Sequence, residues 1–475
     1  MKKAKIAIIG LGHYIYFQQF AGLREELIGK NAEFAQYIDK DRCDVVDIGY
    51  IDCARDAFSA VRRIKCEDPD LIFVILSTYV PSAVAAPLAR YIDVPQVLVA
   101  IQPLSHLDYS HTTTYMQLAN DDVCAMPEIA GVYERLGNGA PACLVATSAQ
   151  VDYIKREVDE WIDAASATAA FKYSTIGYLG HTYEGMYDMH TDPTAYTAAF
   201  GAHVQMLEMC ELVELCHGVT DIEIKEKINV ITDTFKICEP SVDPLTDTVK
   251  KSDLELSARV AVALDKLVER HGLTALAYYY KGEPETEYEK IAANLIIGNT
   301  LLTSTGIPLA GEADLKTAAA MLIMSRIGGG GSFAEIHPFD SESDIVLIGH
   351  DGPHNIAISE GKPRLRKLKK YHGKSGSGIG VEFSLKSGPI TCLCINTDRN
   401  VAFRMIVAEG MSLEGEIPQT GNTNTRVSFG CPVNEFLTRW CEAAPTHHLA
   451  LGIGHKISSL KKLSKMTGIP LTIVK

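Results

Sequence analysis

Residues 71–76 read Leu-Ile-Phe-Val-Ile-Leu, an uninterrupted apolar run of strand length. This run belongs to a series of short runs rich in Ile, Val and Leu, which lie at 5–10, 44–49, 70–76, 95–100 and 141–147. Longer helix-like segments separate them. Strands that are buried on both faces by crossover helices have this composition. The first part of the chain is therefore predicted to be a doubly wound α/β domain. Ligands of such sheets lie beyond the carboxyl ends of the strands, which directs attention to residues 10–19.

The segment that follows the first of these runs resembles a dinucleotide fingerprint only in part. Gly10 and Gly12 have the required spacing, but Ile15 stands where the third glycine belongs. That glycine allows the helix to pack closely on the strand, so its absence disfavours nucleotide binding here.

The hydrophobic periodicity of the chain changes twice after the first domain. Apolar spacing near 3.6 predicts helices over 221–235, 252–271 and 286–302, with a strand-like interruption at 273–280. Beyond residue 328, Gly-rich turns and short alternating strands predict a largely antiparallel β region that ends in one helix and a terminal strand. We therefore expect an N-terminal α/β domain (1–178), a central helix-rich α/β domain (179–327) and a C-terminal β-rich domain (328–475). The basic strip at 362–370 is expected to be a solvated edge strand or a subunit contact.

Composition excludes several classes of protein. The 475 residues include 45 basic and 59 acidic side chains, and the net charge of −14 disfavours nucleic acid as a partner. No apolar run near the N-terminus approaches the ~18–20 residues of a membrane helix, and no signal peptide is recognisable, so a cytoplasmic protein without membrane contact is expected. The twelve cysteines include no C-x-x-C pair, which argues against a zinc knuckle or a disulfide framework.

The candidate catalytic and metal-ligating residues lie between 309 and 355, with a second group at 445–448. Residues 310–316, Ala-Gly-Glu-Ala-Asp-Leu-Lys, are expected to open a helix with two carboxylates in its first turn. Glu335, His350 and the pair His447-His448 follow. Two carboxylates and two imidazoles would form a mixed site for a divalent ion such as Mn²⁺. Surface glutamates and satisfied core histidines remain the alternative, because no pair has the H-E-x-x-H spacing.

Other catalytic patterns are absent. No serine stands in a G-x-S-x-G elbow. Gly373-Lys374-Ser375 resembles the end of a phosphate loop, but residue 368 is Leu where the earlier glycine belongs, so a turn is expected.

Taken as a set, these residues resemble L-arabinose isomerases. The resemblance rests on Ala310-Gly311-Glu312-x-Asp314-x-Lys316-Thr317-Ala318, Ser332-Phe333-x-Glu335, Gly349-His350 and His447-His448, in the family's order and at about its separations. The wider group includes L-fucose isomerases. The segments 349–353, 371–374 and 421–424 indicate a divergent arabinose/fucose isomerase-like branch.

The resemblance implies an aldose–ketose isomerase that acts through a cis-enediol. The best expectation is L-arabinose to L-ribulose, or a related aldose such as L-fucose. Glu312, Glu335, His350 and His448 would bind Mn²⁺, or another divalent ion such as Co²⁺ or Mg²⁺, and the two glutamates would transfer the protons. Substrate contacts would come from His13, Ile15, Tyr16, Met186 and His447. The family also implies a homo-oligomer, a hexamer with pockets shared between subunits.

Two departures from the family concern the pocket. Residues 184–190 replace a family Gly-Asp-Asn-Met-Arg stretch, so an arginine is lost and an aspartate is gained. Residues 124–128 contain no histidine, whereas the family supplies one there from a neighbouring subunit. A non-catalytic sugar-binding regulatory protein is the alternative, although a sensor would not need both proton-transfer carboxylates.

Overall fold

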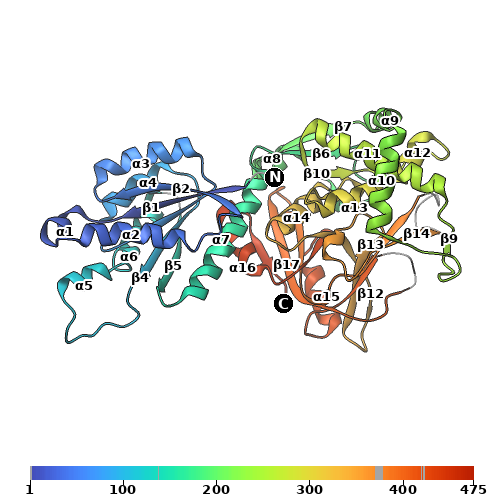
Figure 1. Ribbon diagram of the computed structural model, residues 1–475. Coiled ribbons are helices and arrows are strands. Elements are labelled where there is room, and N and C mark those ends of the chain that lie inside the picture. The colour runs from blue at the N-terminus through green and yellow to red at the C-terminus, as the bar shows by residue number, and fades with distance from the viewer. Residues whose placement is uncertain (1–2, 137–138, 370–377, 419, 421–422) are drawn as a thin grey trace. The chain divides into compact units, whose positions relative to one another are not determined.

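The computed structural model describes residues 3–136, 139–369, 378–418, 420 and 423–475 (Figure 1). The chain divides into two compact units, Met1–Ala169 and Ala170–Lys475, and each is described by itself. The boundary expected between a central and a C-terminal domain, at 327/328, falls inside the second unit and stays a prediction. In the described ranges no helix is both long and apolar enough to cross a membrane.

The first unit is built on a five-stranded parallel sheet with the order β2-β1-β3-β4-β5. Its strands are β1 (Ala4–Leu11), β2 (Cys43–Ile51), β3 (Leu71–Leu76), β4 (Gln96–Gln102) and β5 (Ala142–Thr147). Its helices are α1 (Tyr14–Gln19), α2 (Leu23–Ala35), α3 (Ala54–Glu67), α4 (Ser82–Tyr91), α5 (Thr114–Ala119), α6 (Met126–Leu136) and α7 (Val151–Phe171). The strand order reverses between β1 and β3, which is where ligands of doubly wound sheets bind.

Helices cover both faces of this sheet, as the sequence predicts. Helices α3, α4 and α6 pack side by side over the face that carries Ile9, Val74 and Leu76. The opposite face receives α2, whose Phe34 ring lies 5.0 Å from that of Phe73 between centroids. Neighbouring residues of a strand point to opposite faces, so Phe73 and Val74 belong to different layers of the core.

The second unit begins with a four-stranded parallel sheet of order β11-β10-β6-β7. Its strands are β6 (Thr175–Leu179), β7 (His203–Leu207), β10 (Leu273–Tyr278) and β11 (Leu309–Ala310). Its helical elements are η1 (Tyr187–Met189), α8 (Pro193–Phe200), α9 (Met209–His217), α10 (Asp221–Thr234), α11 (Lys251–His271), α12 (Glu287–Ala292), α13 (Leu295–Ser304), η2 (Gly311–Ala313) and α14 (Leu315–Arg326). The parallel α/β arrangement expected for this region is confirmed.

One helix predicted from spacing is in fact two. The apolar pattern over 286–302 is divided into α12 and α13 at Asn294. The buried Asn294 side chain donates to the carbonyl oxygen of Lys290 and accepts from the hydroxyl of Ser257. An asparagine that captures backbone groups in this way competes with the helical ladder.

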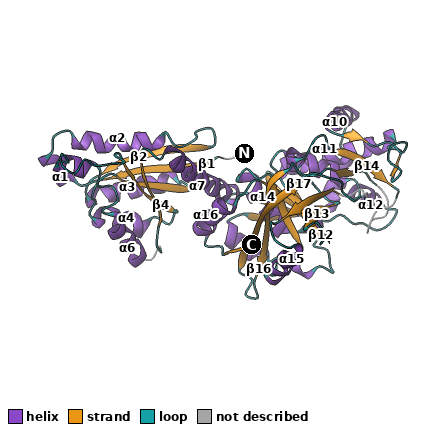
Figure 2. Ribbon diagram, turned by 90° about the horizontal axis from the view of Figure 1, so that it is seen from below, coloured by secondary structure: helices purple, strands orange, loops and turns teal. Residues whose placement is uncertain are grey.

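A closed barrel of six antiparallel strands forms the β-rich part of the unit (Figure 2). The ring runs β16-β19-β12-β13-β18-β17, and β17 pairs with β16 to close it. The barrel strands are β12 (Ser332–Asp340), β13 (Ile345–His350), β16 (Gly388–Thr397), β17 (Phe403–Leu413), β18 (Thr423–Ser428) and β19 (His448–Ile453), and β20 (Leu471–Ile473) extends β17 in parallel. The remaining helical elements are η3 (Ile356–Ile358), α15 (Val433–Glu442) and α16 (Ile457–Thr467). The largely antiparallel β region is therefore confirmed, and it ends as expected in one helix, α16, and a terminal strand, β20, while α15 lies between β18 and β19.

The basic strip at 362–370 does not form a solvated edge strand. Its strand β14 (Arg364–Leu368) lies in the middle of a small sheet with β8 (Lys236–Ile237), β9 (Thr246–Asp247) and β15 (Gly380–Glu382). Arg366 is buried between two carboxylates, with Nε 2.8 Å from Asp243 Oδ2 and Nη1 2.6 Å from Glu382 Oε2. The edge-strand expectation was wrong because acidic partners from distant segments neutralise this cation.

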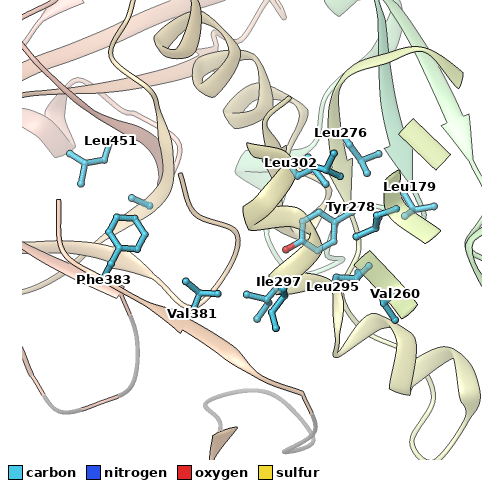
Figure 3. Close-up of a cluster of buried hydrophobic side chains, with 14 of the residues drawn as sticks. Leu179, Val260, Leu276, Tyr278, Leu295, Ile297, Leu302, Val381, Phe383 and Leu451 are labelled. Atoms are coloured by element: carbon cyan, nitrogen blue, oxygen red, sulfur yellow. The ribbon is translucent and has the colours of Figure 1, made fainter. Parts of the chain in front are cut away.

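Parallel sheet and barrel share one hydrophobic core. Leu276 and Tyr278 from β10 lie near the apolar residues of α13, and Val381, Phe383 and Leu451 of the β-rich part belong to the same cluster (Figure 3). Helix α14 contacts both β10 and the barrel strands β16 and β19, and every residue from Leu315 to Met324 is buried. A helix that is buried all round holds its neighbours rigidly in place. This rigid junction is where the candidate site is built.

Candidate metal centre

Three neighbouring barrel strands bring Glu335, His350 and His448 together. Glu335 of β12 pairs directly with His448 of β19 on one side and with Gly349 of β13 on the other. His350 follows Gly349 at the end of β13. A Cβ at position 349 would lie 1.7 Å from the carbonyl oxygen of Thr423, so only glycine allows β18 to approach there. The register of the barrel therefore sets the relative positions of these three side chains.

Glu312 arrives from the parallel sheet and lies in a strained turn. The sequence predicts a carboxylate in the first turn of a helix, but α14 begins only at Leu315 and Glu312 lies in the preceding 3₁₀ turn. Glu312 and Ala313 both have left-handed backbones, with φ of 59° and 56°. Such conformations cost non-glycine residues about 1–3 kcal/mol each and are found where function requires them.

The side chains of these elements converge on one point. Ligand atoms of Glu335, His350 and His448 lie within 4.8 Å of one another, as do those of Glu312, His447 and His448. Both triplets include His448, whose Nε2 is 3.7 Å from Glu312 Oε2. The four residues that the sequence nominates as metal ligands are thus brought together, and their role as ligands stays a prediction.

Unpaired polar atoms at this point fit a divalent cation. Glu312 Oε2 and His448 Nε2 are buried and have no hydrogen-bond partner. Leaving buried polar atoms unpaired costs about 1–3 kcal/mol each, so a cation bound between these two atoms would relieve that cost. Two carboxylates with imidazoles form a donor set that suits first-row divalent metals. The residues present therefore fit such an ion.

Asp314 fixes the orientation of His448. Its Oδ2 lies 3.2 Å from His448 Nδ1 and also accepts from the Thr317 hydroxyl, while Oδ1 caps α14 by accepting from Lys316 N and Thr317 N. Burial raises the pKa of Asp314, but the bonds from His448 and Thr317 outweigh it and the net pKa is lowered. Burial lowers the pKa of His448. A neutral imidazole with its proton on Nδ1 presents the Nε2 lone pair to the centre.

Asp188 binds His447. Its Oδ2 accepts from His447 N at 2.9 Å and from His447 Nδ1 at 2.7 Å. Burial lowers the pKa of His447, but the bond to Asp188 outweighs it and the net pKa is raised. Asp188 and His190 belong to the segment 184–190, which we call the strap. The buried ammonium of Lys316 fixes the strap by donating to the carbonyl oxygens of Asp188 and His190. His447 is therefore held at the centre by a carboxylate.

A cavity of about 1130 Å³ opens beside the centre. Its wall includes the predicted residues Glu312, Glu335, His350, His447 and Met186. It also includes residues that the sequence did not single out, among them Tyr183, Tyr278, Tyr280, Lys281, Glu289 and Asp351. The Tyr-Tyr-Lys run at 279–281 follows the parallel strand β10, and the carboxyl end of such a strand was the available signal.

The remaining predicted substrate residues lie in the first unit. His13, Ile15 and Tyr16 follow the carboxyl end of β1, at the switch point of that sheet. The His13 ring lies 5.0 Å from that of Tyr16 and 6.3 Å from that of Tyr79, so an aromatic group surrounds it. Their part in substrate binding stays a prediction. Residues 371–374, the loop 373–375, Gly421 and Asn422 lie outside the described residues.

Comparisons with known proteins show similarity to L-arabinose isomerases. The model of the L-arabinose isomerase central domain matches residues 180–330. An L-arabinose isomerase of Shewanella baltica is 23% identical over 339 residues, which cover 68% of this chain and 65% of that protein. Those of Vibrio parahaemolyticus and Bacillus subtilis are 21% and 22% identical and cover 88% and 78% of this chain, and 84% and 76% of their own. The chain is thus similar to L-arabinose isomerases, at the level of identity of a divergent relative.

Proposed function

We propose that the protein is a divalent-metal-dependent aldose–ketose isomerase. The observation that carries the proposal is the pair of unpaired buried atoms, Glu312 Oε2 and His448 Nε2, 3.7 Å apart beside Glu335 and His350. The names of the relatives support L-arabinose as the first substrate to test. L-fucose or another aldose is the next candidate, because identities of 20–23% and the altered strap at 184–190 leave room for a different sugar.

The reaction needs a base for a carbon-bound proton and a second group that moves a hydroxyl proton. Glu312 and Glu335 both line the cavity and meet at the same centre, so they suit these two roles. His447, held by Asp188, lies beside Glu312 and can hydrogen-bond a sugar oxygen.

The metal would be held by Glu312, Glu335, His350 and His448. When bound it would supply electrophilic stabilisation for the negative charge that develops on the substrate oxygens. Mn²⁺ is the ion we propose, with Co²⁺ and Mg²⁺ as substitutes, since mixed carboxylate and imidazole sites accept all three. Asp314 positions His448 for this role in the way that carboxylates orient metal-bound histidines in other sites.

We further propose that the protein works as a homo-oligomer, with a hexamer as the first state to test. The residues His13, Ile15 and Tyr16 belong to a different compact unit from the metal centre. In this proposal they contribute to the sugar pocket, as the corresponding segment of the family does. Light scattering coupled to size exclusion tests it, and a monomer at assay concentration would overturn the oligomer.

The chemistry is tested by substituting one proposed proton carrier. Glu312→Gln keeps the shape of the side chain but removes its basicity, so ketose formation should fall by at least about a hundredfold. Glu342→Gln, an exposed glutamate on the turn after β12, is the matched control and should keep wild-type turnover. In D₂O the wild-type product should carry deuterium at C1, because a proton passes through an exchangeable carboxyl group.

The regulatory alternative predicts a different pattern. A sugar sensor on this fold would bind an aldose without forming ketose, and Glu312→Gln would change no rate. Equal, negligible ketose formation by the wild type and the variant, with sugar binding in both, would favour that alternative over the isomerase.

A further inference from the structure

The cavity extends well past the metal centre. A cavity of about 1130 Å³ is larger than typical small-molecule sites, which have about 300–1,000 Å³. Its wall also includes Tyr183, Tyr280 and Lys281, which lie outside the strands that carry Glu335 and His350. An open-chain pentose occupies only a fraction of this volume, so the wall around Lys281 is available for a further group of the substrate.

Lys281 is the single lysine or arginine among the described residues that line this cavity. Its side chain is held in place by two tyrosines, with Nζ 4.8 Å from the ring centroid of Tyr183 and 6.0 Å from that of Tyr280. These two rings are almost parallel, with an interplanar angle of 7°. Ammonium groups near tyrosine faces are stabilised by the ring quadrupole, which positions the cation without neutralising it.

The hydrogen-bonding capacity of Lys281 is largely unused. Nζ donates to Tyr183 Oη at 3.3 Å, and within the described part of the chain no carboxylate lies within salt-bridge distance of it. An ammonium has three donors and no acceptor, so two donors remain. A half-buried cation with free donors, facing a substrate cavity, is suited to an oxyanion.

The position of Lys281 is coupled to the catalytic turn. Lys281 follows the carboxyl end of β10, the central strand beside β11 and Glu312. The backbone N–H of Tyr183 donates to the carbonyl oxygen of Glu312 at 3.3 Å, so the tyrosine beside Lys281 is attached to the strained turn. The acidic groups Glu289 and Asp351 also line the cavity and would repel an anion that approaches them, whereas Lys281 would attract it. An anionic group is thereby directed to Lys281.

We propose that Lys281, with the Tyr183 hydroxyl, forms an oxyanion subsite, and that the substrate is an aldose with a phosphate or carboxylate group remote from C1 and C2. This inference rests on the proposed isomerase function and narrows its substrate class. The reacting end of the sugar would lie at Glu312 and Glu335 and its anionic end between the two tyrosines. Binding of the anionic end would be sensitive to ionic strength.

Inorganic phosphate is the first probe, with titration calorimetry on the full-length Mn²⁺-loaded protein. Lys281→Met should weaken phosphate binding at least about tenfold, and Lys281→Arg should restore most of it because the charge is retained. Lys290→Met, at an exposed lysine on α12, is the matched control and should bind phosphate like the wild type. Phosphate that binds equally well to Lys281→Met, or does not bind to the wild type, would overturn the proposal.

Three sugars of the same configuration then identify the anionic group. D-Galactose, D-galactose 6-phosphate and D-galacturonate differ only at C6, so the ranking of their affinities reports the subsite. At least one anionic sugar should bind about tenfold more tightly than D-galactose, and Lys281→Met should abolish the difference. Equal affinities for all three would overturn the proposal.

The two proposals fail separately. If oxyanion binding depends on Lys281 but no aldose yields ketose, the proposed isomerase function is refuted and the proposed oxyanion subsite is supported. Turnover of neutral aldoses with no Lys281-dependent preference for an anion would remove the subsite and leave the isomerase.

Discussion

At the scale of single residues, Asp188 holds His447 at the candidate centre. Two hydrogen bonds to one carboxylate oxygen fix both the backbone and the ring of His447. The resemblance stated from the sequence implies a gained carboxylate near the pocket. It could not identify His447 as the partner of Asp188, because 259 positions separate the two residues.

Asp188→Asn tests the role of this bond. The amide retains the size of the side chain but removes the charge that raises the pKa of His447, so kcat for ketose formation should fall at least about tenfold. Metal affinity should fall less than kcat, since the hydrogen bonds between Asp188 and His447 involve none of the four proposed ligands. Glu184→Gln, an exposed carboxylate of the same strap, is the control. Equal kcat for both variants and the wild type would show that Asp188 has no part in turnover.

Strain in the turn at Glu312 and Ala313 gives a second residue-scale prediction. Ala313 has φ of 56° and is buried, so Ala313→Gly should raise the free energy of unfolding by about 0.5 kcal/mol. Ala318→Gly, inside α14, should lower it by about 1 kcal/mol because glycine weakens a helix interior. Urea denaturation of both variants measures the difference. A loss of stability in Ala313→Gly would show that the turn is not strained.

At the scale of elements, the strands were the most predictable part of the molecule. Runs such as 71–76 are apolar throughout because both faces are buried, and they appear as strands at the expected places. The predictions that failed depended on partners remote in sequence. Arg366 is buried by Asp243 and Glu382, and the helix at 286–302 is divided at Asn294, whose side chain accepts from the distant Ser257. Local patterns contain no information about such partners.

The candidate site also has a part that the sequence predicts and a part that it does not. The residue types and their order nominated Glu312, Glu335, His350 and His448, and barrel pairing brings three of them side by side. The strained conformation of Glu312 could not be predicted, because the sequence reads as the first turn of a helix. Tyr183, Tyr280 and Lys281 lacked any motif, and only the cavity reveals them.

The N-terminus of α10 provides a pH-dependent prediction. Bonds from Lys266 and from the Thr220 backbone lower the pKa of Glu223 to about 2, from an ordinary value of 4.5. A carboxyl group whose pKa is lower in the folded state stabilises the fold above its unfolded pKa, and this contribution is lost as the pH falls through the folded pKa. Its stabilising effect should therefore be complete above pH 4.5 and should disappear towards pH 2.

Thermal unfolding of Glu223→Gln measures this contribution. The variant should have a lower Tm than the wild type at neutral pH, and the two should converge as the pH falls. Glu226→Gln, an exposed glutamate of the same helix, should show no pH-dependent difference. A constant difference between Glu223→Gln and wild type across the range would contradict the assigned pKa.

At the scale of the whole molecule, the proposed metal should stabilise the second unit because it binds atoms that only the fold brings together. At a free Mn²⁺ concentration of 100 Kd the expected stabilisation is about 2.7 kcal/mol. Calorimetric scans with and without EDTA should show a higher Tm with metal, and His448→Ala should abolish the shift. A Tm that is indifferent to Mn²⁺ in the wild type would contradict a metal centre built from Glu312, Glu335, His350 and His448.

The most direct test of the central claim is ketose formation by metal-stripped protein, with and without added Mn²⁺, across L-arabinose, L-fucose, D-galactose, D-arabinose and D-galactose 6-phosphate. Metal-dependent isomerisation predicts that one or more of these aldoses yields ketose only after Mn²⁺ is restored. Ketose formed at the same rate by the stripped protein, or none formed from any aldose by protein shown to hold Mn²⁺, would contradict it.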